Sequence, residues 1–137
     1  FEIANILQYH RIDYLAVAYA DEGVELRKAG ISAPIMIMNP DEQSYDAIIK
    51  HNLEPEIYNF RSLDMLEEKI KENILPDNKP VKVHIKLDTG MHRLGFLPED
   101  VDLLISRLSP GAVKKAFRKT HHANSSLLRP RILFFIN

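Results

Sequence analysis

Hydrophobic and polar positions follow a repeating order along the first 109 residues. Four times, a short apolar run is followed by a segment whose apolar positions recur at helical spacing. The predicted strands cover residues 14–19, 35–38, 56–59 and 81–88. The predicted helices cover residues 2–9, 21–30, 41–49, 62–70 and 98–109. Strands that alternate with helices in this way predict parallel βα units and therefore an α/β fold.

Residues at the ends of the segments support three of these helices. Asp21 and Glu22 place negative charge in a first helical turn, and Gly30 marks the end of the same helix. We expect Asp41 to cap the next helix and Ser62 to cap the one after it. The local signals thus agree with the periodicity.

Parallel βα units build either an open doubly wound sheet or a part of an eight-unit barrel, and periodicity alone does not choose between them. An open sheet that binds nucleotides usually carries a glycine-rich turn after its first strand. The chain has five glycines, and none lies in such a pattern. We therefore predict a partial (β/α)8 TIM-type barrel of about four βα units over residues 1–109.

Residues 110–137 differ from the rest of the chain in composition. They carry 6 Lys and Arg and no acidic residue, whereas residues 1–109 carry 12 Lys and Arg and 19 Asp and Glu. A basic segment can bind nucleic acid or anionic lipid. We favour instead an irregular tail that does not continue the domain, for example through a translated frameshift, and we expect no nucleic-acid partner.

The composition narrows the class of protein further. The 45% hydrophobic and 27% charged residues are typical of a soluble globular chain, and no apolar stretch of about 18 residues could span a membrane. The absence of cysteine excludes disulfides and thiolate metal sites, which agrees with a cytoplasmic location. The chain begins with Phe1 rather than Met, and no signal peptide pattern comes after it, so we expect a truncated start. The pair His121-His122 is a weak metal signal, and we expect no metal site.

The strand at residues 81–88 carries polar side chains that suggest chemistry. Its apolar positions are Val81, Val83, Ile85 and Leu87, and its polar positions are Lys82, His84, Lys86 and Asp88. A solvent-exposed edge strand would show the same alternation. In a barrel, however, the polar face points inward, and active sites lie at the C-terminal ends of the strands. His84, Lys86 and Asp88 are then candidate site residues, although we favour a structural role for His84 over that of a proton carrier.

The segment after this strand places Arg93 between Gly90 and Gly95. Such a loop can bring a guanidinium and backbone N–H groups over the strand end, toward an anionic ligand. The segment from residue 84 to 96, His-Ile-Lys-Leu-Asp-Thr-Gly-Met-His-Arg-Leu-Gly-Phe, is similar to the one by which alanine racemases are identified. Residues 26–35 match the helix and strand that precede it, so the resemblance spans about residues 1–109.

The resemblance implies a pyridoxal-phosphate enzyme of fold type III, with a barrel domain, a β-rich domain and a homodimer with shared active sites. Arg93 matches the arginine that donates to the phenolic oxygen of the cofactor and lies near the substrate carboxylate. Lys86 matches a lysine that is often carbamylated. A partly desolvated lysine can lose its proton and capture carbon dioxide, and the resulting anion would hold Arg93. An ordinary ion-paired lysine is the alternative. The resemblance also implies that Met91 packs near the site and that many relatives carry Gly or Asn in place of His92.

The function implied is the interconversion of L- and D-alanine, which supplies D-alanine for peptidoglycan. Racemisation needs a base on each face of Cα. The family uses a lysine that also anchors the cofactor and a tyrosine of the partner subunit, and neither has a counterpart here, so we expect the chain alone to be inactive. Another amino-acid racemase, a D-amino-acid lyase of the same barrel family, or a non-catalytic remnant are the alternatives.

Overall fold

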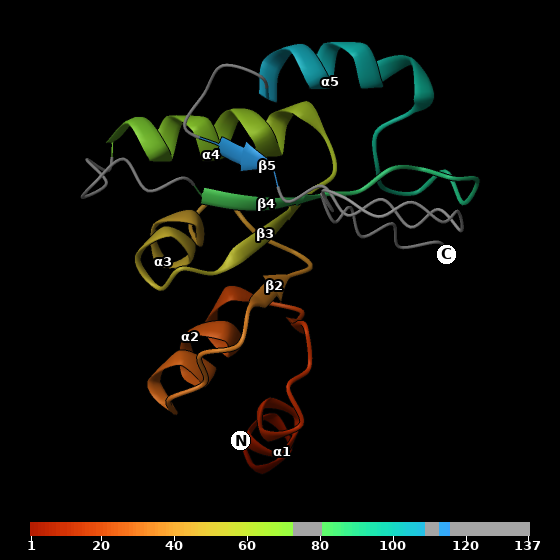
Figure 1. Cartoon of the computed structure of the whole chain (residues 1–137). Helices are drawn as coiled ribbons and strands as arrows, with labels where there is room; N and C mark the ends of the chain where they lie inside the picture. The colour runs from red at the N-terminus through yellow and green to blue at the C-terminus, as the bar shows by residue number, and fades with distance from the viewer. Residues whose placement is uncertain (73–80, 109–112, 116–137) are drawn as a thin grey trace.

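The computed structural model describes residues 1–72, 81–108 and 113–115, and its centre is a parallel sheet. The described strands form one five-stranded sheet in the order β1-β2-β3-β4-β5, so each strand lies beside its neighbour in sequence. The strands are β1 (Leu15–Val17), β2 (Ile35–Ile37), β3 (Glu54–Ile57), β4 (Val81–Ile85) and β5 (Val113–Lys115). Figure 1 shows this sheet twisting from β2 at the bottom to β4 and β5 at the top.

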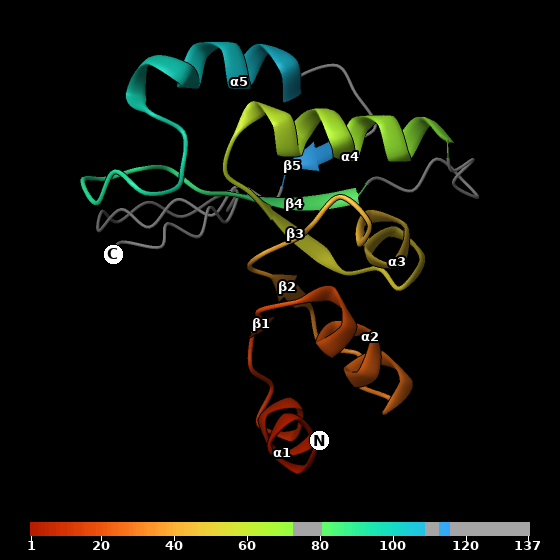
Figure 2. The same ribbon diagram turned by 180° about the vertical axis from the view of Figure 1, so that it is seen from behind.

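The helices are α1 (Glu2–Tyr9), α2 (Ala20–Lys28), α3 (Tyr45–Lys50), α4 (Phe60–Glu72) and α5 (Val101–Leu108), with a 3-10 turn at Pro98–Asp100 before α5. Helices α2 to α5 lie along one side of the curved sheet, and α1 lies beyond the β1 edge (Figures 1 and 2). A doubly wound sheet would reverse its strand order and carry helices on both faces. The sequential order and the one-sided helices therefore confirm the prediction of a partial barrel.

The hydrophobic core fills the space between the sheet and its helices. Its fully buried members include Ile35, Ile37, Tyr45, Ile57, Leu63 and Leu66. Gly23 allows α2 to lie close to the sheet, because a Cβ at this position would come within 2.9 Å of Cδ1 of Ile37. The hydroxyl of Tyr45 donates to the carbonyl of Ser62 at 3.2 Å, so its polar atom is satisfied inside the core.

Two helix ends show how far local signals predict the boundaries. Gly30 has φ of 85° and follows the C-cap of α2, and the N–H of Ile31 reaches back to the carbonyl of Leu26, as the sequence predicts for a glycine stop. The start of α4 differs from the prediction. Asn59 accepts from the N–H of Ser62 at 2.7 Å, so Asn59 is the capping residue and Ser62 lies in the first turn.

The C-terminal segment begins with a strand that the sequence analysis does not predict. Residues 113–115 pair in parallel with β4, in the register Val81 with Val113 and Val83 with Lys115. This strand lies within residues 110–137, for which the sequence analysis expects an irregular tail. A strand of three residues with two lysines is too short and too polar for periodicity to detect. The other residues of the predicted tail lie outside the described part of the chain.

Candidate functional site

The inner face of β3 and β4 is the face that points away from the helices. On β4 the residues that alternate with the buried Val81, Val83 and Ile85 belong to this face. Only 3% of His84 is exposed, and 12% of the Lys86 side chain, whereas Lys82 is 58% exposed. A solvent-exposed strand would leave all three in water. The polar side chains of β4 therefore lie on the inner face of the partial barrel, which is the orientation that the sequence analysis favours.

Two carboxylates on β3 complete this face, and the sequence analysis missed both. Glu54 and Glu56 are buried, and Glu56 lies opposite His84 in the parallel register. Oε2 of Glu54 lies 2.9 Å from Nε2 of His84, and Oε1 lies 3.5 Å from Nζ of Lys82. Their spacing of two residues, which matches the spacing of the basic residues on β4, is the signal that could have revealed them.

The two carboxylates differ in their electrostatic surroundings. Burial by itself would raise the pKa of Glu54, but the hydrogen bond and the charge interaction with His84, followed by Lys82, bring this pKa below its ordinary value. Burial also raises the pKa of Glu56, and Lys86 offsets only a part of this effect. The interactions of Glu54 therefore favour its carboxylate form, whereas the burial of Glu56 disfavours its charge.

His84 is held by two neighbouring side chains. Its Nε2 faces Glu54, and its ring contacts the ring of Tyr14 edge to face, with centroids 5.1 Å apart and an angle of 89°. Its Nδ1 is buried and has no hydrogen-bond partner in the described part of the chain. These contacts give His84 the structural role that the sequence analysis favours.

The loop at residues 88–96 follows the C-terminal end of β4 and is closed by backbone and side-chain bonds. The carboxylate of Asp88 accepts the N–H groups of Gly90 and His92 at 2.9 and 3.0 Å, which lower the pKa of Asp88. The N–H of Phe96 donates to the carbonyl of Lys86, and the N–H of Asp88 donates to the carbonyl of Phe96. The loop therefore returns to the strand from which it leaves.

Glycine is required where the loop returns. Gly95 has φ of 127°, and a Cβ at this position would lie 2.5 Å from the backbone nitrogen of Asp88. His92 has φ of 54°, in the left-handed region that glycine and asparagine adopt most readily. Its Nδ1 lies 3.2 Å from Oδ2 of Asp88, a contact that fixes this conformation. This geometry explains why Gly or Asn suits the position of His92.

Arg93 lies near the tip of this loop and is exposed. Within the described residues its guanidinium makes no hydrogen bond or ion pair, so it is available to an anionic ligand. Lys86 pairs with Glu56 at 3.4 Å rather than contacting Arg93. Two cations repel when no anion lies between them, and the predicted link between Lys86 and Arg93 stays a prediction. Met91 is 53% exposed, and the expectation that it packs near the site stays a prediction.

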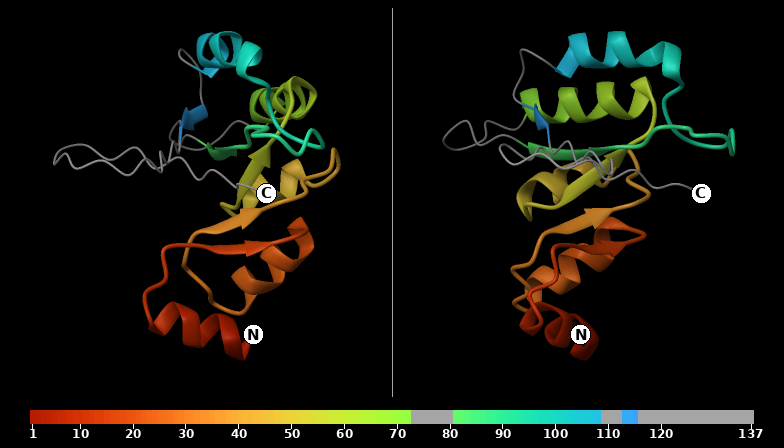
Figure 3. Two further views of the ribbon diagram at one scale, coloured as in Figure 1. Left: turned by 90° about the vertical axis from the view of Figure 1, so that its right-hand side faces the viewer. Right: turned by 45° about the vertical axis from the view of Figure 1, so that its right-hand side comes forward.

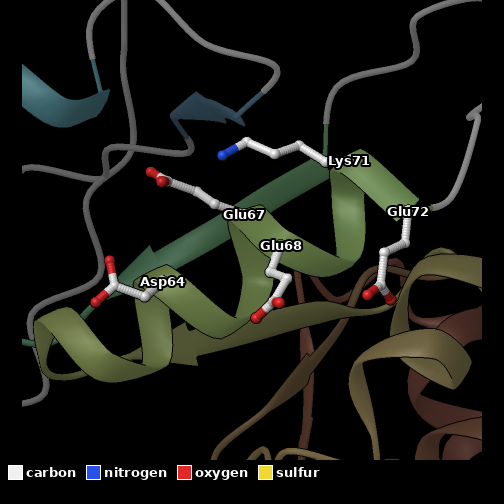
Figure 4. Close-up of a pocket in the computed structure, with 5 residues that line it drawn as sticks. All are labelled: Asp64, Glu67, Glu68, Lys71 and Glu72. Carbon is white, nitrogen blue, oxygen red and sulfur yellow. The ribbon is translucent and has the colours of Figure 1, made fainter.

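A separate acidic surface lies on α4. Figure 4 shows Glu67 and Lys71 pointing to one side of the helix and Glu68 and Glu72 to the other. Arg107 of α5 lies 2.7 Å from Asp64 and 2.8 Å from Glu67 and links the two helices. In residues 1–72 and 81–108 no cluster of His, Asp and Glu side chains could hold a metal ion. The acidic residues Asp64 and Glu67 therefore serve to join α4 to α5 through Arg107.

Comparison with known proteins identifies the class to which this barrel belongs. The model of the family described as alanine racemase, N-terminal domain, matches residues 1–129. The alanine racemase of Clostridium tetani is 39% identical over 99 residues, which cover 72% of this chain and 24% of that protein. An amino-acid racemase of Enterococcus faecalis is 33% identical over 138 residues, which cover 100% of this chain and 18% of that protein.

Solved structures agree with the sequence relatives. The alanine racemase of Clostridium difficile 630 superposes with a TM-score of 0.74 at 31% identity, over 83% of this chain and 30% of that chain. The fold is thus that of the α/β barrel racemases. The chain belongs to the alanine racemase family, within the N-terminal domain, and the resemblance is confirmed.

The extent of the match adds two facts. The family match reaches residue 129, which is beyond residue 109, where the sequence analysis ends the resemblance. The division into a domain at 1–109 and a tail at 110–137 stays a prediction. The chain spans about a quarter of the length of the curated relatives it matches. None of the helices in the described residues is long and apolar enough to cross a membrane.

Proposed function

We propose that this chain is part of a pyridoxal-phosphate-dependent alanine racemase, which interconverts L- and D-alanine in the cytoplasm and supplies D-alanine for peptidoglycan. The observation that carries this proposal is the loop with Arg93 at the C-terminal end of β4, in a chain of the alanine racemase family. The family likeness also supports a homodimer as the working form of the complete enzyme.

The side chains at the strand end fit one part of the cofactor. Pyridoxal phosphate is anionic, and the exposed guanidinium of Arg93 has no competing partner among the described residues. Arg93 would donate to the phenolic oxygen of the cofactor and lie near the substrate carboxylate, and it keeps its charge at every physiological pH. When bound, the cofactor supplies a ring that accepts electrons as the Cα proton leaves. Arg93 orients both anionic groups beside that ring.

Lys86 is the second residue that we assign to the site, as the lysine that can be carbamylated. Its side chain is largely buried on the inner face, seven residues before Arg93. Carbamylation would convert the Lys86 cation into an anion, which could bind the guanidinium of Arg93. In the unmodified protein Lys86 instead forms an ion pair with Glu56.

The chain holds no residue that matches the family's cofactor-anchoring lysine or its tyrosine base. We therefore infer that it contributes recognition of the cofactor and of the substrate carboxylate, while other segments of the enzyme move the Cα proton. Alone, it is inactive. A mixture of the purified chain with pyridoxal phosphate, reduced with borohydride, should give no specific adduct by mass spectrometry and no D-alanine. A stoichiometric adduct on one lysine together with turnover would contradict this.

A chimera tests the proposal for the complete enzyme. Residues 1–108 would replace the matched segment of the Clostridium tetani alanine racemase, and formation of D-alanine would be measured. We expect racemase activity, and we expect Arg93→Ala to lower kcat/KM by about 100-fold because a charged donor to the reacting system is lost. Arg61→Ala is the matched control, since Arg61 lies on α4 with 81% of its side chain exposed. A folded chimera that binds cofactor but does not racemise alanine would refute the proposal.

A broader racemase is the second candidate, because the Enterococcus faecalis relative named amino-acid racemase matches the whole chain. The same chimera would be assayed with alanine, serine and larger amino acids. A preference for alanine that follows the Clostridium tetani parent, with no change caused by the new segment, would favour the first proposal. A preference that shifts toward another amino acid would favour the second.

A further inference from the structure

Glu56 and Lys86 form a buried pair that is poorly compensated. Nζ of Lys86 lies 3.4 Å from Oε2 of Glu56, and 12% and 2% of the two side chains are exposed. In the described part of the chain no second hydrogen bond or ion pair reaches the Glu56 carboxylate. Strong hydrogen bonds between an ammonium and a carboxylate measure about 2.7–2.9 Å. The Glu56 carboxylate is therefore buried with one long contact to a cation.

The neighbouring pair on the same face shows the opposite arrangement. Glu54 accepts from His84 at 2.9 Å, has Lys82 at 3.5 Å, and its pKa is lowered. The pKa of Glu56 is raised by burial. Of the two carboxylates, Glu56 is thus the one whose protonation is favoured by burial. The nearest source of that proton is the ammonium of Lys86, whose transfer leaves a neutral amine and a neutral acid.

We propose that Glu56 controls the modification of Lys86: its carboxylate form keeps Lys86 as an unreactive ammonium, and its acid form frees the amine to react with carbon dioxide. This inference deepens the role of Lys86 and rests on the proposed function for the use of the modification, but its test does not require racemisation. Glu56 is a positioning residue, because it acts through Lys86.

The chemical step balances with carbon dioxide as the co-reactant. The lone pair of the neutral Nζ forms a bond to the carbon of carbon dioxide, and the electron pair of one C–O π bond moves onto its oxygen. Nζ then loses one proton to water, which leaves a carbamate with one negative charge. Two neighbouring anions in a buried place repel, so one of them must carry a proton. The proton on Glu56 removes this repulsion, and its O–H donates to a carbamate oxygen.

The test measures the carbamate directly. The purified chain would be incubated with carbon-13 bicarbonate, and the carbamate signal would be recorded by NMR, with Lys86→Arg to assign it. Glu56→Gln cannot hold an ammonium by charge, and its amide can donate to the carbamate. We expect the carbamylation constant to rise about tenfold, because no opposite charge then holds the ammonium form of Lys86. Glu54→Gln is the matched control, because Glu54 is buried on the same strand but faces His84 and Lys82, and it should keep the wild-type signal.

Several results would overturn the proposal. They are an unchanged or weaker signal in Glu56→Gln, an equal rise in Glu54→Gln, or no carbamate in any variant. If circular dichroism shows that Glu56→Gln does not fold, Glu56→Asp takes its place. The shorter side chain withdraws the carboxylate from Nζ and should give a smaller rise, whereas a fall below wild type would refute the idea. Loss of racemase activity in the chimera with an intact carbamate response would instead reject only the proposed function.

Discussion

The two faces of β3 and β4 are built on different principles. The face toward the helices carries Ile57, Val83 and Ile85, which are buried among other apolar side chains. The inner face carries Glu54, Glu56 and His84, which are also buried, and Lys86, which is partly buried, and these residues are held by ion pairs. Burial of apolar groups stabilises the fold in proportion to area, whereas a buried charge depends on one partner. The outer face thus supplies stability, and the inner face supplies groups whose protonation can change.

The largest effect is expected when one partner of a buried pair is removed. His84→Leu leaves the Glu54 carboxylate without its closest partner, and it should lower the free energy of unfolding by about 3–5 kcal/mol. The double variant with Glu54→Met removes both charges and should recover most of this loss. Urea denaturation of the two variants measures the difference. Equal losses in the single and the double variant would show that packing, rather than charge, governs this face.

A smaller and more graded loss is expected on the outer face. Ile57 is fully buried, and Ile57→Val removes one methylene-sized group from the core. The free energy of unfolding should fall by about 0.5–1.5 kcal/mol, since no polar group is left without a partner. Denaturation by urea with an unchanged m value is the measurement. A loss as large as that of His84→Leu would erase the distinction between the faces.

The pH dependence of stability separates the two carboxylates within the inner face. The pKa of Glu54 is lowered in the folded protein, so its contribution is present above its unfolded pKa and is lost as the pH falls through the folded value. The pKa of Glu56 is raised, so it destabilises the fold increasingly as the pH rises from the unfolded toward the folded value. Toward acid pH, wild type should therefore lose stability relative to Glu54→Gln and gain it relative to Glu56→Gln. Urea titrations from neutral to acid pH test these signs, and parallel curves would contradict them.

The smallest effect is expected at the solvent end of the inner face. Lys82 is 58% exposed and lies 3.5 Å from Glu54, so water can replace its contact. Lys82→Met should change the free energy of unfolding by less than about 1 kcal/mol. Thermal denaturation of Lys82→Met, compared with that of His84→Leu, measures the difference. A loss comparable to the buried pair would mean that Glu54 depends on Lys82 rather than on His84.

The comparison of faces also explains what could be predicted from the sequence. The alternation on β4 predicts the inward direction of His84 and Lys86, because only one face of that strand is polar. The predicted strand at residues 56–59 begins after Glu54, whereas β3 spans Glu54–Ile57, so the sequence analysis does not place both acids on one strand. The parallel register then brings them beside β4. Pairing between strands, rather than local pattern, assembles the candidate site.

The start of α4 and the strand β5 were not predicted correctly, and the reasons are related. Asn59 caps α4 through its side chain, but Ser62 offers the same chemistry one turn later, and single-sequence signals do not rank them. The strand β5 is recognisable by its parallel partners on β4 and not by its own composition. In contrast, the resemblance carried by residues 84–96 identified the family from a single segment. Its glycines are required by the backbone of the loop, and Arg93 supplies a charged donor for an anionic ligand.

The order of the strands has a consequence for how the chain folds during synthesis. In the sheet of the described residues, each strand after β1 pairs with the strand that precedes it in sequence. A nascent chain that emerges from the ribosome therefore already contains the partner of every new strand, and each unit can dock without waiting for distant segments. Figure 3 shows the units following one another from the N-terminal helix upward. Folding can then advance one unit at a time in the direction of translation, and each new strand pairs with the edge left by the strand before it.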